Sequence, residues 1–454
     1  MNDKNKQVLL SLRFIPFVLT NGMNLFPVLI LAQLFLKHRD IDKYVLPLIL
    51  YFSFKTTILF LVRLKPITVN HLLQFAIIIG AIGSFLGSLY EVNLYFGLLA
   101  GAFIGICSGL LYPSFLTVQF HEKTYNNFST GKKDQLYSIG FALVYSVILF
   151  LLIKHSLPMT FLFLGGSLLL LLFILRAYPP YEIEDDVSDP NYPVFETLFL
   201  FTTGFFTIFI IKADKKLGIA ESLPIFFLFL GTLIILYWFF LKRIKPERRL
   251  TPLVTRMIIY KGMLTNFILV FCTFYQLIKE GGMAINKIYL IYLVAITLAP
   301  MLYSRLLKKF LENNITDVIA IGIGGGFVLL LFGPTFYVGV LVLTIFTSQL
   351  NLRLNNLVYT EANLPKDYRL LAKYRLTNVG SVLNQLIMMF VMYVGTLVFK
   401  NVTVDEILQS YTYKHVNEAT FQTMDLTKYI LITGFLLALY LLQKSFKEEK
   451  QSNF

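Results

Sequence analysis

Long apolar stretches separated by short polar ones run along the whole of this 454-residue chain. A helix that crosses about 30 Å of hydrocarbon needs about 20 mainly apolar residues, and most of these stretches reach or approach that length. The pattern predicts an all-α integral membrane protein with about fourteen spans. The expected spans are residues 8–36, 44–63, 70–90, 94–119, 135–154, 157–177, 194–211, 220–241, 256–278, 284–304, 316–332, 335–352, 374–399 and 427–443.

The basic residues between the spans set their direction. Cytoplasmic loops of membrane proteins carry an excess of Lys and Arg. Most of the 40 Lys and Arg residues fall in loops that face the cytoplasm if the N-terminus does, including the run Lys242-Arg-Ile-Lys-Pro-Glu-Arg-Arg249. The alternation holds to the end of the chain, which predicts that both termini lie in the cytoplasm and that the protein is a multi-pass protein of the inner (plasma) membrane.

Composition agrees with lipid as the solvent for much of the chain. Hydrophobic residues make up 56% and charged residues only 15%, whereas a soluble domain carries about 25% charged residues. The net charge of +14 lies in short loop clusters, so we expect no nucleic-acid partner. Cys107 and Cys272 lie inside apolar stretches, and we expect no disulfide, metal, cofactor or catalytic residue.

A weak internal repeat divides the chain. Three short matches occur in the same order at an offset of about 240 to 245 residues and point to one duplication. They are Leu19-Thr-Asn21 with Leu264-Thr-Asn266, Ala76-Ile-Ile-Ile-Gly80 with Ala320-Ile-Gly-Ile-Gly324, and Ser138-Ile-Gly140 with Asn378-Val-Gly380. We therefore expect two like-oriented six-helix halves, residues 1–178 and 250–454. Between them, residues 179–249 form an acidic linker, two extra spans and a basic loop.

This layout resembles the major facilitator superfamily, in its fourteen-span branch similar to drug:proton antiporters. Three features carry the resemblance: the glycine-rich fourth span that ends at Pro113, the basic passage Phe240-Leu-Lys-Arg-Ile-Lys-Pro-Glu-Arg-Arg-Leu-Thr-Pro252, and a long loop at 400–426. The resemblance implies two major-facilitator-type bundles plus two central extra helices. It also implies a substrate site between the halves, which is exposed to each side of the membrane in turn.

The chain also departs from the family's pattern. The loop between spans 2 and 3, Arg63-Leu-Lys-Pro66, keeps only the basic character of the family's motif, and span 5 lacks the Gly-Pro pair associated with antiporters. Span 1 carries Asn21 and Asn24 where a membrane aspartate is common. The fold is therefore expected, whereas proton antiport is not.

Lys55 is the only ionisable side chain near the middle of an expected span. Such a group is costly in hydrocarbon, so its presence is a functional hypothesis. Lys55 is a candidate for substrate contact and for coupling to an ion, and the alternative is a structural lysine bound by backbone carbonyls. Arg13 and Lys261 lie closer to the cytoplasmic ends of spans 1 and 9, so their long side chains could reach the interface.

In the family's fold the first and fourth helices of each half line the cavity, which the resemblance maps to spans 1, 4, 9 and 12. Polar residues there are candidate substrate contacts, although such groups also stabilise helix pairs in lipid. Besides Lys55, the candidates are Asn21, Asn24, Ser114, Asn266, Thr347, Gln349 and Asn351.

The leading functional hypothesis is a secondary active transporter, not an enzyme, that exports a small amphipathic or anionic molecule by alternating access. The bilayer and a small-molecule substrate are its expected partners, and a periplasmic adaptor could extend the export route. Two alternatives stay open. One is a membrane-embedded glycosyltransferase. Such enzymes carry acidic residues in their first outer loop, and Asp40-Ile-Asp42 resembles that pattern. The other is a lipid-linked-sugar flippase of an unrelated fold.

Overall fold

The computed structural model describes residues 12–38, 42–62, 68–126, 132–178, 194–217, 250–280, 283–302, 315–361, 364–398 and 418–452, with a few isolated positions between 231 and 239. Within these ranges the chain is helical, and no strand is present. The chain forms two compact units. Unit 1 holds residues 1–213, 221–247 and 364–372, and unit 2 holds residues 214–220, 248–363 and 373–454.

Nine of the described helical segments are long and apolar enough to cross a membrane, and one bent pair of helices forms a tenth candidate. Three shorter apolar segments, within 197–210, 287–302 and 315–331, coincide with the expected spans 7, 10 and 11. Span 8, the acidic linker and the basic loop lie outside the described residues. The chain is thus a multi-pass helical membrane protein, and the count of fourteen and the orientation stay predictions.

The helices differ from the expected spans at four places. Span 1 is not continuous: α2 (Phe14–Gly22) and α3 (Phe26–Lys37) meet at an angle of 41°. At the other three places a helix extends beyond the expected apolar segment. They are α6 (Leu94–Tyr125), α17 (Lys366–Val398) and α19 (Glu418–Ser452), the last of which begins inside the expected loop 400–426. Hydropathy misses such extensions because polar residues at helix ends are helical without being apolar.

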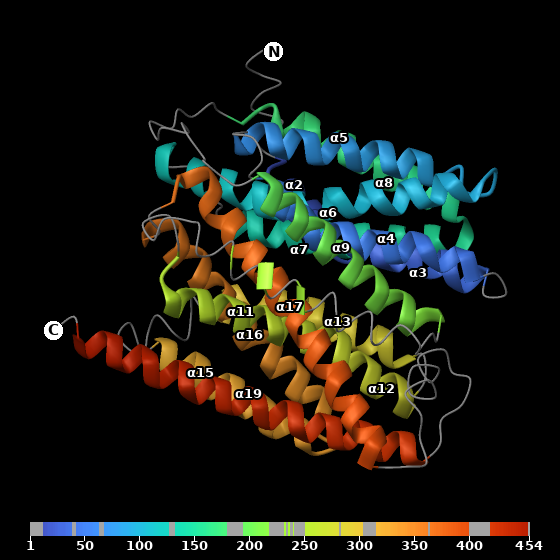
Figure 1. Cartoon of the computed structure of the whole chain (residues 1–454). Helices are drawn as coiled ribbons and strands as arrows, with labels where there is room; N and C mark the ends of the chain where they lie inside the picture. The colour runs from blue at the N-terminus through green and yellow to red at the C-terminus, as the bar shows by residue number, and fades with distance from the viewer. Residues whose placement is uncertain are drawn as a thin grey trace. The chain divides into compact units, whose positions relative to one another are not determined.

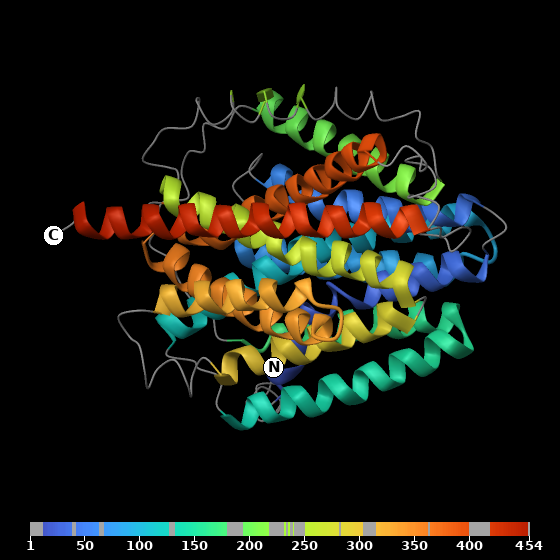
Figure 2. The ribbon, with the colours of Figure 1, turned by 90° about the horizontal axis from the view of Figure 1, so that it is seen from below.

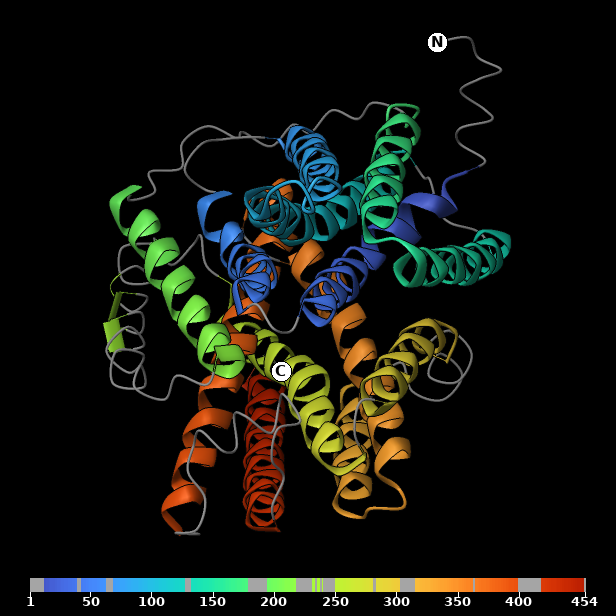
Figure 3. The ribbon, with the colours of Figure 1, turned by 90° about the vertical axis from the view of Figure 1, so that its right-hand side faces the viewer.

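Unit 1 is organised around α6, which packs against α4 (Leu46–Leu61) and α5 (Val69–Gly87) (Figures 1 and 3). Helix α8 (Leu157–Leu175) packs against α5, and α7 (Lys132–His155) packs against α2 and α8. Glycines of α6 at every fourth position face the backbone of α4. A Cβ at Gly101 would overlap the carbonyl oxygen of Pro47, and one at Gly105 would lie 2.6 Å from that of Tyr51. Such small residues let membrane helices approach closely.

The break in span 1 follows from Pro27, which lies at the start of α3. Proline has no backbone N–H and clashes with the carbonyl four residues earlier, so the helix cannot continue through it. That carbonyl belongs to Met23, and it accepts hydrogen bonds from Ser108 Oγ (2.8 Å) and Tyr51 Oη (3.3 Å) instead. Side chains of α6 and α4 therefore satisfy the broken backbone.

Unit 2 contains α11 (Pro252–Asn266), η5 (Phe267–Cys272), α12 (Thr273–Glu280), α13 (Met283–Leu302), α15 (Ile315–Leu331), α16 (Phe336–Glu361), most of α17, and α19. The main contacts join α15 and α13 to α16, and α15 also lies beside α19 (Figures 1 and 2). Phe267, Phe327 and Phe435 pack ring against ring in the core. Segment α9 (Val194–Leu217) lies between the two halves of the sequence.

The two halves share an irregularity at corresponding places. In unit 1 the helix breaks just after Asn21, and in unit 2 a π-helical segment, η5, begins just after Asn266. Both asparagines end the Leu-Thr-Asn triplet of the sequence repeat. Short π-helical segments and broken spans occur often at functional sites, which directs attention to these two helices.

Candidate substrate site

Polar side chains of α16 and α17 meet inside unit 2. Thr347, Asn351 and Asn355 are spaced by four residues and so lie on one face of α16. Lys373 of α17 is fully buried, and its ammonium donates to the Oδ1 atoms of both Asn351 and Asn355. It also lies 4.4 Å from the centre of the Tyr374 ring, an arrangement that favours a cation.

The crossing of α11 and α17 brings a second lysine to the same place. A Cβ at Gly262 would overlap the backbone carbonyl of Thr377, so the two helices touch through their main chains. Lys261 precedes Gly262, and Lys373 lies one turn before Thr377, so both lysines flank the crossing. Lys261 is 8% exposed, which contradicts the expectation that its side chain extends to the interface.

Amide groups continue the polar surface along the crossing. Asn384 Nδ2 donates to Asn266 Oδ1 at 2.9 Å, and Ser381 Oγ donates to the carbonyl of Gly262 at 3.2 Å. We name the charged and amide residues of this region the lysine–amide cluster. Its members are Lys261, Asn266, Asn351, Asn355, Lys373 and Asn384.

Buried polar atoms without a hydrogen-bond partner concentrate around this cluster. Among the described residues of unit 2 they include Asn384 Oδ1, Gln385 Oε1, Thr347 Oγ1 and Gln349 Oε1. Buried polar groups in proteins are almost always hydrogen-bonded to protein or to ordered water. The helices that carry the cluster therefore present polar atoms that water or a bound molecule could satisfy.

In unit 1 the structure brings Lys55 and Asn24 together. Lys55 Nζ donates to the backbone carbonyl of Asn24 at 3.0 Å, at the break between α2 and α3. The ammonium also lies 5.3 Å from the centre of the Tyr51 ring. Lys55 is half-buried and Asn24 is exposed. The carbonyl contact fits the structural alternative for Lys55, and a lysine at a broken span is equally placed for a role in transport.

The remaining candidates of unit 1 lie apart from this contact. The Asn21 side chain donates to the carbonyl of Phe17 at 2.7 Å, one turn earlier on its own helix. Ser114 is completely buried on α6, and its hydroxyl has no partner in the structure. In unit 2, Asn266 and Asn351 belong to the lysine–amide cluster, whereas Thr347 and Gln349 lie beside it on α16 as buried side chains.

A second polar site lies within unit 1, to which the first turns of α17 belong. Asp367 accepts from the backbone N–H of Val69 (3.2 Å), and its other oxygen lies 2.8 Å from His121 Nε2. Asp367 and His121 are both buried. Thr68 stands at the N-cap of α5, but its hydroxyl lies 2.8 Å from His71 Nδ1 and does not cap the helix. Asp367 therefore supplies the N-terminal cap of α5 from a distant part of the chain.

Replacing Asp367 with alanine is expected to destabilise unit 1, because the change removes the cap of α5 and leaves buried His121 without its carboxylate. Loss of a cap and of a buried hydrogen-bond partner costs about 1–3 kcal/mol. The thermal unfolding midpoint of the purified protein measures the effect. Glu448→Ala is the control, since Glu448 is exposed and its ion pair with Lys444 spans 4.0 Å. Equal midpoints for the two variants would contradict the capping role.

The other buried lysine of unit 2 differs from the cluster because it has a carboxylate partner. Lys428 Nζ lies 3.1 Å from Asp425 Oδ1 and 3.1 Å from Tyr275 Oη, and Tyr275 donates to Asp425 at 2.6 Å. This group joins α12 to the start of α19. It needs no ligand for its charge balance, and we interpret it as structural.

Unit 1 has a similar tyrosine–carboxylate–lysine group outside its spans. Tyr90 Oη donates to Glu91 at 2.8 Å, and Lys37 Nζ lies 3.3 Å from the same carboxylate. The hydrogen bond from Tyr90 and the one from Lys37 hold the pKa of Glu91 below its ordinary value. Burial, followed by the bond to Glu91, raises the pKa of Tyr90. Glu91 is therefore ionised at neutral pH and ties α3 to the loop after α5.

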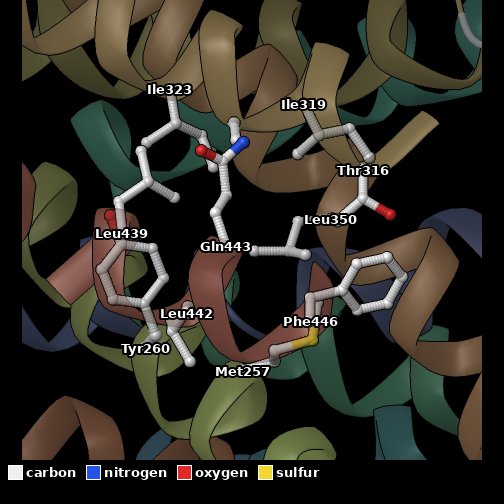
Figure 4. Close-up of a pocket in the computed structure, with 11 residues that line it drawn as sticks. Met257, Tyr260, Thr316, Ile319, Ile323, Leu350, Leu439, Leu442, Gln443 and Phe446 are labelled. Atoms are coloured by element: carbon white, nitrogen blue, oxygen red, sulfur yellow. The ribbon is translucent and has the colours of Figure 1, made fainter. Parts of the chain in front are cut away.

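A small pocket in unit 2 is lined mainly by apolar side chains. Figure 4 shows Ile319, Ile323, Leu350, Leu439 and Phe446 around it. The hydroxyl of Tyr260, another lining residue, donates to the carbonyl of Phe435 at 3.1 Å. No member of the lysine–amide cluster lines this pocket. In the part of the chain that the structure describes, no group of His, Cys, Asp or Glu side chains could hold a metal ion.

Sequence reasoning missed Lys373, Asn355, Asn384, Asp367 and His121. The expected span 13 began at residue 374, so Lys373 was assigned to a loop. A signal was present, because Lys373, Thr377, Ser381 and Asn384 recur at helical spacing and predict a polar stripe on one helix face. Asp367 gave no such signal, since its role depends on contacts with residues far away in the sequence.

Solved structures resemble this chain along its full length. The Escherichia coli fucose:proton symporter aligns with a TM-score of 0.52 and 15% identity, over 96% of this chain and 98% of the symporter. A bacterial homologue of the human drug peptide transporters aligns with a TM-score of 0.52 and 12% identity, over 99% and 100%. A further peptide transporter of the POT family gives 0.50 and 13%, over 97% and 98%. No family model matches the sequence, and no curated protein matches it.

Because these sequences are only 12–15% identical to this chain, the similarity shows a shared fold and does not show a shared function. The chain shares the overall fold of these solved structures. Assignment to the drug:proton antiporter branch stays a prediction. The resemblance covers nearly the whole of each compared chain, so it does not rest on a few apolar helices alone.

Proposed function

We propose that this protein is a secondary active transporter, not an enzyme, that exports a small amphipathic or anionic molecule from the cell by alternating access. Its fold supports the proposal, since the similar chains are described as a fucose:proton symporter and as peptide transporters. A fold by itself does not determine a function. The proposal therefore depends on the chemistry inside the helices.

The lysine–amide cluster is the observation that carries the proposal. Its two lysines and four amides lie on helices that are otherwise apolar enough to cross a membrane. Polar and ionisable groups inside membrane helices are costly and commonly mark the path of a substrate or an ion. A purely structural helix bundle has no evident use for two buried lysines that find no carboxylate partner among the described residues.

In the proposed cycle the two six-helix halves, residues 1–178 and 250–454, rock about a site near the middle of the membrane. In unit 2, span 9 supplies the amide of Asn266 toward it. The polar side chains of α16 and α17 supply the charge and most of the hydrogen bonds. An ion gradient or the substrate's own gradient supplies the energy, and residues 179–249 form an acidic linker and two extra spans that connect the halves.

The experiment that tests the proposal has two stages. Growth of a deletion strain is compared with that of its parent across a panel of compounds, and an exporter predicts greater sensitivity of the deletion strain to its substrates. Transport of the compounds so identified is then measured in inside-out membrane vesicles, with and without a pH gradient. Accumulation above that of vesicles from the deletion strain supports a carrier, and its dependence on the gradient reports coupling. Equal accumulation in both kinds of vesicle would contradict it.

The membrane-embedded glycosyltransferase and the lipid-linked-sugar flippase are the competing functions. Both act on lipid-linked sugars, whereas the carrier proposed here moves a small amphipathic or anionic molecule. Turnover or flipping of a lipid-linked sugar by the purified, reconstituted protein would favour them. Of the acidic residues that suggested the glycosyltransferase, Asp42 begins a short helical turn, η1 (Asp42–Val45), and Asp40 lies outside the described residues.

Replacing Lys55 with alanine is expected to abolish transport while expression stays near that of the wild type. The ammonium holds the carbonyl of Asn24 at the break of span 1, and loss of this bond frees the segment that the cycle must place accurately. Vesicle transport and the amount of protein in the membrane are measured together. Unchanged transport would remove Lys55 from the mechanism and leave it a structural residue.

A further inference from the structure

The two halves balance their buried charge differently at corresponding crossings. In unit 1, Arg13 at the start of span 1 pairs with Asp134 at the start of span 5, with 2.5 Å between Nη2 and Oδ2. The sequence repeat makes α11 and α17 the counterparts of α2 and α7. At that crossing unit 2 carries Lys261 and Lys373, and the described residues offer neither lysine an ion pair. The described residues therefore neutralise the positive charge at this crossing in unit 1, whereas they do not neutralise the two lysines at the corresponding crossing in unit 2.

The groups around Lys373 stabilise a cation without neutralising it. The Oδ1 atoms of Asn351 and Asn355 and the ring of Tyr374 present dipoles and π electrons, which carry no net charge. Lys261 flanks the same crossing, because the neighbouring Gly262 meets the backbone of Thr377, one turn after Lys373. Charges removed from water are normally paired, so two lysines at one crossing, for which the described residues provide no carboxylate, form a site that lacks an anion.

A neighbouring side chain could help to complete such a site. Among the described residues the buried hydroxyl of Thr347 has no partner, and it lies one turn before Asn351 on the same face of α16. A hydroxyl can donate a hydrogen bond to an oxyanion. A donor on α16 thus lies near the positive charge that Lys373 of α17 brings to Asn351.

We propose that the lysine–amide cluster binds the anionic group of the substrate, a carboxylate or a phosphate, through the ammonium groups of Lys261 and Lys373. The proposal rests on the proposed function for the identity of the ligand as substrate. Binding itself can be tested without transport. The amides that hold Lys373 orient its ammonium, and the anion supplies the counter-charge that the described part of the protein does not provide.

Thermal unfolding of the full-length protein in detergent tests the proposal. Cys107 and Cys272 are both fully buried, so a maleimide that fluoresces on reaction with thiols reports unfolding. The probes are sodium benzoate, sodium phenyl phosphate and uncharged benzamide, at constant ionic strength. A ligand that binds only the folded protein raises the unfolding midpoint, and we expect a rise of about 2 °C or more with benzoate or phenyl phosphate. Benzamide matches the shape of benzoate without its charge and is expected to give no rise.

Three variants assign the effect to the cluster. Lys373→Met and Lys261→Met keep the length and most of the volume of the side chain but remove its charge, and each is expected to abolish the rise. Lys428→Met removes an equally buried lysine that has its own carboxylate partner, and it is expected to keep the rise even if its starting midpoint is lower. Since the readout is the shift within each variant, a change in basal stability does not obscure it.

The outcomes separate this proposal from the proposed function. A rise with benzoate alone identifies a carboxylate, and a rise with phenyl phosphate alone identifies a phosphate. No rise in the wild type with either anion, or the same rise in Lys373→Met, would overturn the anion site, even if vesicles transport a substrate. Conversely, a rise that depends on both lysines, in a protein that transports nothing, would support the site while the transporter proposal fails.

Discussion

Replacing Lys373 with methionine is expected to reduce transport at least about thirtyfold, because its ammonium is proposed to pair with the anionic group of the substrate. Truncating one partner of such a buried, hydrogen-bonded charge pair costs about 2–5 kcal/mol. Methionine occupies similar space and leaves the apolar packing of α17 intact. Transport is measured in inside-out vesicles with a compound to which the deletion strain is sensitive. Initial rates are normalised to the amount of the protein in the membrane.

The control for this change is Lys428→Met. Lys428 is 4% exposed and pairs with Asp425 at 3.1 Å, so it matches Lys373 in burial and differs from it in having a counter-ion. We expect Lys428→Met to transport at near wild-type rates. If both variants lost transport equally, the effect would reflect disturbed folding of unit 2, and Lys373 would have no special part in it.

Replacing Gly101 with leucine is expected to prevent the close contact of α4 and α6 and to destabilise unit 1 by about 3 kcal/mol or more. The first side-chain carbon would already overlap the backbone carbonyl of Pro47. A backbone atom cannot rotate away as a side chain can, so the helices must separate. The unfolding midpoint and the fraction of protein that elutes as a single species from size exclusion measure the loss.

Gly140→Leu is the matched control, since Gly140 also lies in a membrane helix but has no atom within 4 Å of the position of its Cβ. The same leucine is expected to change the midpoint little there. A large loss in both variants would mean that leucine is harmful at any glycine of these helices. Equal tolerance in both would mean that α4 and α6 can adjust, and the glycine spacing would lose its structural significance.

Hydropathy predicted the coarse architecture, an all-helical multi-pass chain, because it depends on many residues at once. The division into two like-oriented halves stays a prediction. The glycines of span 4 were also predicted as packing positions, because small residues at a spacing of four have few other uses in lipid. The break in span 1 was missed, although Gly22 and Pro27 stood within one apolar stretch. Length alone suggested a single helix there, and the effect of Pro27 on the Met23 carbonyl was not considered.

The candidate site was predicted only in part. Asn266 and Asn351 were named because the family resemblance assigns their helices to the cavity. Lys373 was assigned to a loop because a hydropathy window ends where polar residues accumulate, even when the helix continues. The importance of Lys261 was also missed, since a lysine near the end of a span can usually reach water. Only the tight crossing at Gly262, visible in three dimensions, shows why this one does not.

The cap of α5 has a consequence for biogenesis. The carboxylate of Asp367 and the amide of Val69 that it binds are 298 residues apart. During synthesis the third span therefore enters the bilayer with its first turn incomplete, and it stays so until about four fifths of the 454-residue polypeptide has been translated. Until then the amide of Val69 needs another hydrogen-bond partner, such as water. If the N-terminal bundle were expressed alone, the first turn of α5 would lack the cap that Asp367 supplies and would be expected to fray.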